Sequence, residues 1–277
     1  LLACSSPTGP AFEGAQISCG QRAAAGAVER VRIDPRSLEP RFRVIGSQIW
    51  SDQPDFAASL DQRGVTGICG SGIIEVVAEM YLAGIVSEDG VIDGALRARS
   101  ARIIETGRTW SYLLHDPGDG GAQLLITQND IRQIQLAKAA LYAGIKLLMD
   151  HMGTPNIERI RLAGAFGSHI DVQRAMVLGL IPDCALDQVS SAGNAAGTGA
   201  RIALLNHGSR DLIESLVKRI EKIETALESK FQDYFVDAMA FPNKSDAFPK
   251  LFSTVIRPQP RVPEAFSGSG RKRRRRV

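Results

Sequence analysis

The sequence lacks the signals that mark several specialised classes of protein. Its four cysteines, at positions 4, 19, 69 and 184, form no CxxC pair and no cluster with metal-ligand spacing, so the pattern predicts no metal site. No run of residues approaches the roughly 20 apolar positions that cross a bilayer, and no charged start precedes an apolar segment as in a secretory signal. These absences favour a cytoplasmic protein with reduced thiols and no membrane contact.

Positive charge is also scarce outside one short segment. The net charge is +3, and removing the six basic residues at 271–276 leaves −3 on the rest of the chain. Runs of arginine can bind nucleic acid, but no aromatic residues interleave with these. We therefore interpret the run as a solvated tail and predict no nucleic-acid partner.

The order of the predicted elements is typical of a layered α/β protein. The chain has 277 residues, 44% of them hydrophobic, which is enough for one large α/β unit or two smaller ones. Strands are predicted at 28–33, 43–45, 102–105, 110–114, 122–126 and 157–162. Helices are predicted at 73–83 and 128–152. A short helix is predicted to follow Asp171, another is predicted to end at residue 205, and the last begins at Ser209 and carries an apolar stripe that reaches Leu227. Strands that alternate with helices across glycine-rich turns indicate an α/β fold.

The composition changes at the two ends of the chain. Leu1 begins a segment that resembles the inside of a strand, which indicates that the sequence starts at a fragment boundary. Beyond Pro242 the chain becomes proline-rich, then rich in glycine and serine, then basic. We therefore predict a lobe over residues 1–242, followed over 243–277 by an extended arm that ends in a disordered tail.

The first of three glycine-rich turns lies where the helix at 73–83 is predicted to begin. The sequence GICGSG at 67–72 would present unpaired N–H groups and the positive end of the helix dipole, which suit a phosphate. It matches neither the GK[ST] of a Walker A loop nor GxGxxG, so tight helix packing explains its glycines equally well. The helix itself has an apolar core face, with Glu75 and Glu79 together on the other face.

Two further turns of small residues follow. LAGAFG at 162–167 lies at the end of a predicted strand, which is where α/β proteins usually bind ligands. An adenine ring could lie against this turn, and a tight strand-to-helix turn without a ligand is the equal alternative. In SAGNAAGTG at 191–199, Asn194 is the candidate ligand contact. The two alanines after Asn194 and Gly199 favour instead a helix that packs closely against its neighbours.

One charged residue lies on an otherwise apolar helical stripe. Lys138 shares the stripe of the helix at 128–152 with apolar residues at spacings of three and four. Burying an unpaired ammonium is expensive, so Lys138 must either extend to water, the common outcome, or meet an anion such as a nucleotide. Gln135, one turn earlier, would then help. Glu13 is the candidate for holding a metal-bound water, although capping of a loop is its favoured role.

Five motifs in order carry a resemblance to a known family: CSSPTGPAFEGA at 4–15, GICGSG at 67–72, ITQNDI at 126–131 with QLAK at 135–138, LAGAFG at 162–167 and GNAAG at 193–197. Together they resemble the C-terminal domain of the reductive activators of corrinoid proteins, within the actin, sugar kinase and chaperone (ASKHA) ATPase superfamily. The resemblance runs from residue 1 to about Pro242. The set is far more specific than any one loop.

The resemblance implies an RNase H-like lobe of an actin-like ATPase, an α/β fold in which helices flank a mixed sheet. It also implies ATP and Mg²⁺ in a cleft between two such lobes. The nucleotide contacts that it implies are Gly70, Ser71, Gly72, Gln135, Lys138, Gly164, Ala165, Phe166, Gly167 and Asn194.

The resemblance further implies an activity and its partners. In such activators a ferredoxin-type domain with a [2Fe–2S] cluster precedes the ATPase domain and delivers an electron that reduces cob(II)alamin to cob(I)alamin, a step that ATP makes possible. The partner would be a corrinoid protein of a methyltransferase system, and a homodimer is an allowed state. Two DxGT-type phosphate loops and the cluster cysteines belong upstream of Leu1, so we expect this chain alone to bind ATP weakly and to hydrolyse it negligibly. The alternatives are a docking module without catalysis and a kinase-like phosphotransferase.

Overall fold

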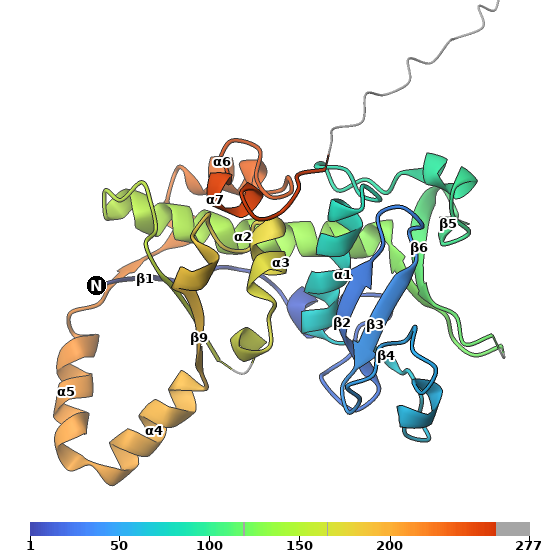
Figure 1. The fold of residues 1–277 in the computed structure, drawn as a ribbon. Coiled ribbons are helices and arrows are strands. Elements are labelled where there is room, and N and C mark those ends of the chain that lie inside the picture. Colours follow the sequence, from blue (N-terminus) through green and yellow to red (C-terminus); the bar gives the residue numbers. More distant parts are fainter. Residues whose placement is uncertain (119, 165, 259–277) are drawn as a thin grey trace, which may run out of the picture.

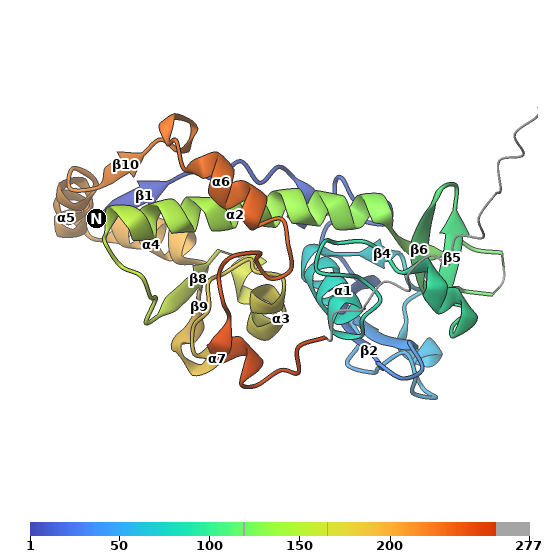
Figure 2. The ribbon, with the colours of Figure 1, turned by 90° about the horizontal axis from the view of Figure 1, so that it is seen from above.

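One long helix, α2 (Gln128–His151), runs through most of the molecule and carries other elements on its sides (Figures 1 and 2). The computed structural model describes residues 1–118, 120–164 and 166–258. The other helices are α1 (Gly70–Leu82), α3 (Val172–Val177), α4 (Ala195–Leu205), α5 (His207–Val217), α6 (Phe231–Asp237) and α7 (Pro249–Phe252). The strands are β1 (Leu2–Cys4), β2 (Ala27–Ile33), β3 (Pro40–Val44), β4 (Gly67–Ile68), β5 (Ile103–Thr106), β6 (Thr109–His115), β7 (Leu124–Thr127), β8 (Ile160–Ala163), β9 (Val189–Gly193) and β10 (Glu221–Ile223).

The strands form four small sheets within the described residues. β2 pairs with β3 antiparallel and with β4 parallel, so this sheet is mixed, and β5, β6 and β7 form an antiparallel meander. β8 and β9 pair in parallel, as do β1 and β10. The predicted α/β class is confirmed, and the three strands predicted between residues 102 and 126 are those of the meander.

The sequence of α2 explains where this helix begins and which side of it is buried. The Thr127 hydroxyl accepts a hydrogen bond from the N–H of Asp130, and the Asp130 carboxylate accepts one from the N–H of Thr127, which together form a capping box. Ile131, Ile134 and Leu147 are buried on its apolar side. Neither α2 nor any other helix in the described ranges is long and apolar enough to cross a membrane.

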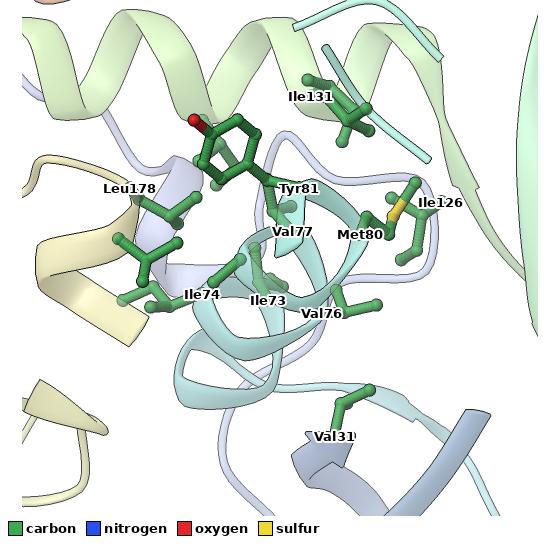
Figure 3. Close-up of a cluster of buried hydrophobic side chains, with 14 of the residues drawn as sticks. Val31, Ile73, Ile74, Val76, Val77, Met80, Tyr81, Ile126, Ile131 and Leu178 are labelled. Atoms are coloured by element: carbon green, nitrogen blue, oxygen red, sulfur yellow. The ribbon is translucent and has the colours of Figure 1, made fainter. Parts of the chain in front are cut away.

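Helix α1 lies at the centre of the hydrophobic core. It packs against β2 and α3, and its side chains meet those of α2 and β7 in the cluster of Figure 3. Every residue from Gly70 to Tyr81 is buried, Glu75 and Glu79 among them. The predicted division of α1 into a core face and an acidic face is therefore incomplete. Both faces are buried, because arginines on β2 and α3 pair with the two carboxylates.

Helices α4 and α5 project away from this core (Figure 1). None of their residues is buried, and large apolar side chains on them are exposed, including Leu204, Leu205 and Val217. No atom outside its own helix lies within 4 Å of the place that a Cβ on Gly199 would take. The prediction that small residues let α4 pack closely is therefore wrong at Gly199, because this glycine faces open space.

The chain beyond Pro242 continues to pack on the body of the molecule. Phe248 and Leu251 are buried in the hydrophobic core. The carboxylate of Asp246 accepts hydrogen bonds from two side chains of α2. Residues 243–258, expected to belong to an extended arm, thus contribute to the folded lobe, whereas the basic run lies outside the described residues.

Candidate functional site

A cavity of about 800 Å³ opens between the N-terminal segment, the start of α1, β2 and the loop that leads into α3. Its size lies within the roughly 300–1,000 Å³ of sites that bind small molecules. It brings together three residues that the sequence predicts as site residues, Glu13, Gly70 and Ser71. The other lining residues are Thr8, Gly9, Phe12, Gln21, Arg22, Ala23, Glu29, Ile45, Cys69 and His169.

Two of the three residues predicted at the start of α1 line this cavity. Gly70 and Ser71 form the first turn, directly after Cys69, whose backbone is extended with φ −90° and ψ 171°. The N–H groups of a first helical turn have no partner inside the helix, and the positive end of the helix dipole lies there. Gly72 has another role, because a Cβ on it would lie 2.3 Å from the carbonyl oxygen of Val28. This glycine lets α1 pack on β2 and does not line the cavity.

The cavity wall carries charges of both signs. Glu13 ends the short turn Ala11–Glu13, and within the described residues its carboxylate accepts no hydrogen bond, so the favoured capping role is not observed there. Arg22 is exposed and forms no ion pair with any described carboxylate. Its guanidinium can attract an anion, whereas Glu13 and Glu29 can hold a cation or a water molecule.

Sequence reasoning missed Arg22, Glu29 and His169. Arg22 lies shortly after the GPAFEG motif and His169 shortly after LAGAFG, so their position beside motifs that meet in the fold was the available signal. Nothing in the residue types themselves distinguishes them from other surface charges.

The two small-residue turns after β8 and β9 lie together. Gly164 has a φ of 99°, and its N–H donates to the carbonyl of Gly193 at 2.8 Å. The side-chain oxygen of Asn194 accepts from the N–H of Gly197 at 2.9 Å, which caps α4. Because Asn194 has this structural partner, a contact between Asn194 and a ligand stays a prediction.

The loop at 164–167 leads toward the cavity wall, and its two glycines do not line the cavity. A Cβ on Gly167 would lie 3.3 Å from the backbone of Leu162, so this turn is tight, as one of the two interpretations expects. Ala165 and the side chain of Phe166 lie outside the described part of the structure. His169, two residues after Gly167, does line the cavity. Nucleotide contacts by the loop itself stay a prediction.

Gln135 and Lys138 are buried, and both bond to the backbone segment that follows α6. The Gln135 amide donates to the carbonyl of Met239 at 2.8 Å. The Lys138 side-chain nitrogen donates to the carbonyls of Ala240 and Pro242, the second at 2.7 Å. Burial lowers the pKa of Lys138 well below its ordinary value. Lys138 is therefore bound by carbonyl oxygens and does not extend to water. Neither Gln135 nor Lys138 lines the large cavity, and their contacts with a nucleotide stay predictions.

Comparison with known proteins identifies the domain. Residues 1–252 match the family model described as the C-terminal domain of RACo, the ASKHA domain. The chain belongs to this family. It is 32% identical over 245 residues to the corrinoid activation enzyme RamQ of Eubacterium limosum, a match that covers 85% of this chain and 38% of that protein. It is also 24% identical over 252 residues to the [Co(II) methylated amine-specific corrinoid protein] reductase of Methanosarcina barkeri, covering 87% and 42%.

A solved structure shares the fold of this RACo ASKHA domain. It is that of a reductive activator for corrinoid, iron–sulfur protein, and it matches with a TM-score of 0.74 at 32% identity. The match covers 87% of this chain and 36% of that chain. The predicted family and the predicted actin-like ATPase fold are therefore confirmed. This chain spans about two fifths of the length of the curated relatives that it matches.

An ASKHA domain implies nucleotide binding, and the cavity offers groups that fit such a ligand. The first turn of α1 and Arg22 suit phosphate oxygens. No group of three or more His, Cys, Asp or Glu side chains in the described ranges is arranged to hold a metal ion. Mg²⁺ commonly binds through one or two carboxylates, several waters and the phosphates of its nucleotide, so Glu13 and Glu29 are the wall residues that fit this ion.

Proposed function

We propose that this chain supplies the C-terminal part of the ATP-binding domain of a protein that reductively activates a corrinoid protein. The observation that carries the proposal is a family match over residues 1–252, together with a cavity lined by the start of α1 and by Arg22, which forms no ion pair within the described residues. The names of the two relatives, a corrinoid activation enzyme and a corrinoid protein reductase, support the class of partner.

The residues of the cavity would divide the work of holding Mg·ATP. The first-turn N–H groups of α1 and the Arg22 guanidinium would bind phosphate oxygens, and Glu13 would orient a water molecule or bind the ion through one. In the intact protein a [2Fe–2S] cluster would supply the one electron that reduces cob(II)alamin to cob(I)alamin, and ATP would supply the free energy for this uphill transfer. We place that cluster and the remaining phosphate loops in a part of the protein outside this chain.

Replacing Arg22 with alanine is expected to weaken the binding of Mg·ATP to the intact protein about tenfold, because a charge-assisted hydrogen bond to phosphate is lost. Arg22 is exposed and forms no ion pair within the described residues, so the fold should be unaffected. Isothermal titration calorimetry measures the change. The control is Arg219→Ala, which removes an exposed arginine beyond α5 and should leave the affinity unchanged. Equal affinities for the two variants would contradict a phosphate-binding role for Arg22.

The activity itself is tested with the intact protein, a corrinoid protein and an electron donor. We expect the electron paramagnetic resonance signal of cob(II)alamin to decay only when ATP is present. Binding of the corrinoid protein without ATP-dependent decay would favour the docking module instead. Transfer of phosphate from ATP to a small molecule would favour the kinase-like alternative.

Three further assignments belong to this proposal. We place the protein in the cytoplasm, which its four free cysteine thiols support. We take a corrinoid methyltransferase system as the wider partner. Light scattering on the intact protein would test the homodimer that the resemblance allows.

A further inference from the structure

A buried carboxylate lies one turn behind the part of α1 that lines the cavity. Glu75 is fully buried and accepts three hydrogen bonds from β2: from the N–H of Val31 at 2.9 Å, from Arg30 at 2.7 Å and from Arg32 at 2.6 Å. Both oxygens of this carboxylate therefore accept hydrogen bonds from β2. The two guanidinium groups are held in fixed positions as a result.

The same two arginines reach across to the opposite wall of the cavity. Arg30 donates to the carbonyl oxygen of His169 at 3.0 Å, and His169 is a lining residue. Arg32 donates to the carboxylate of Asp171 at 3.1 Å, and that carboxylate caps α3 by accepting from the N–H of Arg174. Glu75 thus connects the wall made by α1 and β2 with the loop between β8 and α3.

A second buried carboxylate, one turn further along α1, has a different connection. Glu79 accepts from Arg174 at 2.9 and 2.7 Å and from the N–H of Ile33 at 3.0 Å. These bonds hold α3 against α1. Arg32 also lies 4.0 Å from Glu79, and Arg174 lies 3.7 Å from Asp171, but no bond of Glu79 or of Arg174 reaches the carbonyl of His169 within the described residues. Glu75 and Glu79 are therefore both buried carboxylates on the same helix, and they share Arg32. They differ in that only Glu75 is connected, through Arg30, to the carbonyl of His169.

Stability alone is a poor explanation for the Glu75 cluster. Buried ion pairs are often no more stabilising than apolar side chains of similar volume, because both charges lose their hydration. Most other side chains buried along α1 are apolar, so an apolar contact with β2 was available. The charged cluster differs from an apolar contact in its geometric specificity, because each guanidinium group binds one defined atom of the loop.

We propose that Glu75 is a positioning residue for the nucleotide. Through Arg30 and Arg32 it holds residues 169–171 against the start of α1, so that both walls of the cavity are in place before the ligand binds. A preformed site avoids the entropy cost of ordering a loop on binding, and affinity is therefore higher. The identity of the ligand, ATP, rests on the proposed function. The placement of the loop by Glu75 does not depend on it.

The test compares Glu75→Gln with Glu79→Gln in the intact protein. Glutamine at 75 keeps an acceptor for Val31 but loses the charge that holds the two arginines. We expect the affinity for Mg·ATP to fall about tenfold in the Glu75 variant, with kcat for ATP hydrolysis at saturation changed less than about twofold. The Glu79 variant should stay within about twofold of the wild type in both quantities, although it also loses a buried ion pair. Hydrogen exchange without nucleotide should be faster at residues 167–170 in the Glu75 variant only.

Arg30→Gln provides a second variant in case the loss of a buried charge prevents folding. The Arg30 side chain is 26% exposed, so its removal disturbs the core less, and it should reproduce the loss of affinity. Equal ATP affinity in the Glu75 and Glu79 variants would overturn the proposal. If the wild type binds no ATP, the proposed function fails, and hydrogen exchange then decides the inference by itself. Equal exchange in the two variants would overturn it, whereas faster exchange in the Glu75 variant alone would support it.

Discussion

Replacing Gly72 with alanine is expected to lower the free energy of unfolding by about 3 kcal/mol. The new Cβ would lie 2.3 Å from the carbonyl oxygen of Val28 and 2.9 Å from Cγ1 of Ile68. The first contact is with backbone of β2, which cannot rotate away as a side chain could, so α1 and β2 must separate. Urea denaturation followed by fluorescence of the two tryptophans of the chain would measure the loss.

Gly199→Ala is the matched control for this experiment, because Gly199 is also a helical glycine in a small-residue motif. A Cβ on Gly199 meets no atom outside its helix within 4 Å. Alanine is a better helix former than glycine by about 1 kcal/mol, so this variant should be more stable than the wild type. The two substitutions should therefore shift the unfolding midpoint in opposite directions. Equal shifts would mean that the contact between α1 and β2 does not require glycine at position 72.

The GICGSG motif shows what a sequence pattern can and cannot distinguish. Glycine at a helix start is compatible with a phosphate site and with close packing, and both interpretations stood equal. The structure assigns a different role to each position: Gly70 and Ser71 line the cavity, whereas Gly72 contacts the backbone of β2. The deciding neighbour, Val28, is more than forty positions away in the chain, so no local pattern contains it.

Features that depend on neighbouring residues were predicted well. The helices predicted from residue 128 and after Asp171 both begin at the predicted places, because Thr127 and Asp130 form a capping box and Asp171 caps α3. Their hydrogen bonds join residues three positions apart, so the sequence contains all the partners. The predicted helix from Ser209 is shorter than expected: Asn206 caps it, it ends at Val217, and the apolar stripe continues into β10.

Features that depend on distant residues were predicted poorly. The burial of Glu75 and Glu79 requires arginines of β2 and α3, which come from two other parts of the chain. Likewise the fold joins Glu13 to the start of α1 only because the N-terminal segment passes beside that helix. Charge patterns along one helix cannot show that an acidic face will find basic partners.

Lys138→Met is the second substitution with a large expected effect, about 2–3 kcal/mol of lost stability. The side chain is fully buried and donates to the carbonyls of Ala240 and Pro242. Methionine fills a similar volume but leaves both carbonyls without this donor, and a buried unsatisfied acceptor is costly. The control is Lys146→Met on the same helix, where a partly exposed pair with Asp246 is lost and the effect should be about 1 kcal/mol or less.

The effect of Lys138→Met should also depend on pH. Burial lowers the pKa of Lys138 in the folded chain well below its ordinary 10.5. Between that lowered pKa and 10.5 the unfolded chain binds a proton at this amine that the folded chain does not, so the stability of the wild type rises with pH. A neutral amine still has two N–H groups for the two carbonyls. The methionine variant lacks this titration, and all other titrating groups are common to both proteins.

The stability difference between wild type and variant should therefore grow toward alkaline pH, with a slope of at most about 1.4 kcal/mol per pH unit. Urea denaturation of both proteins at several pH values from about 7 to 10 would measure it. A difference that stays constant with pH would mean that Lys138 keeps its proton in the folded chain. The carbonyls of Ala240 and Pro242 would then bind an ammonium ion, and the lysine would hold this segment by charge as well as by hydrogen bonds.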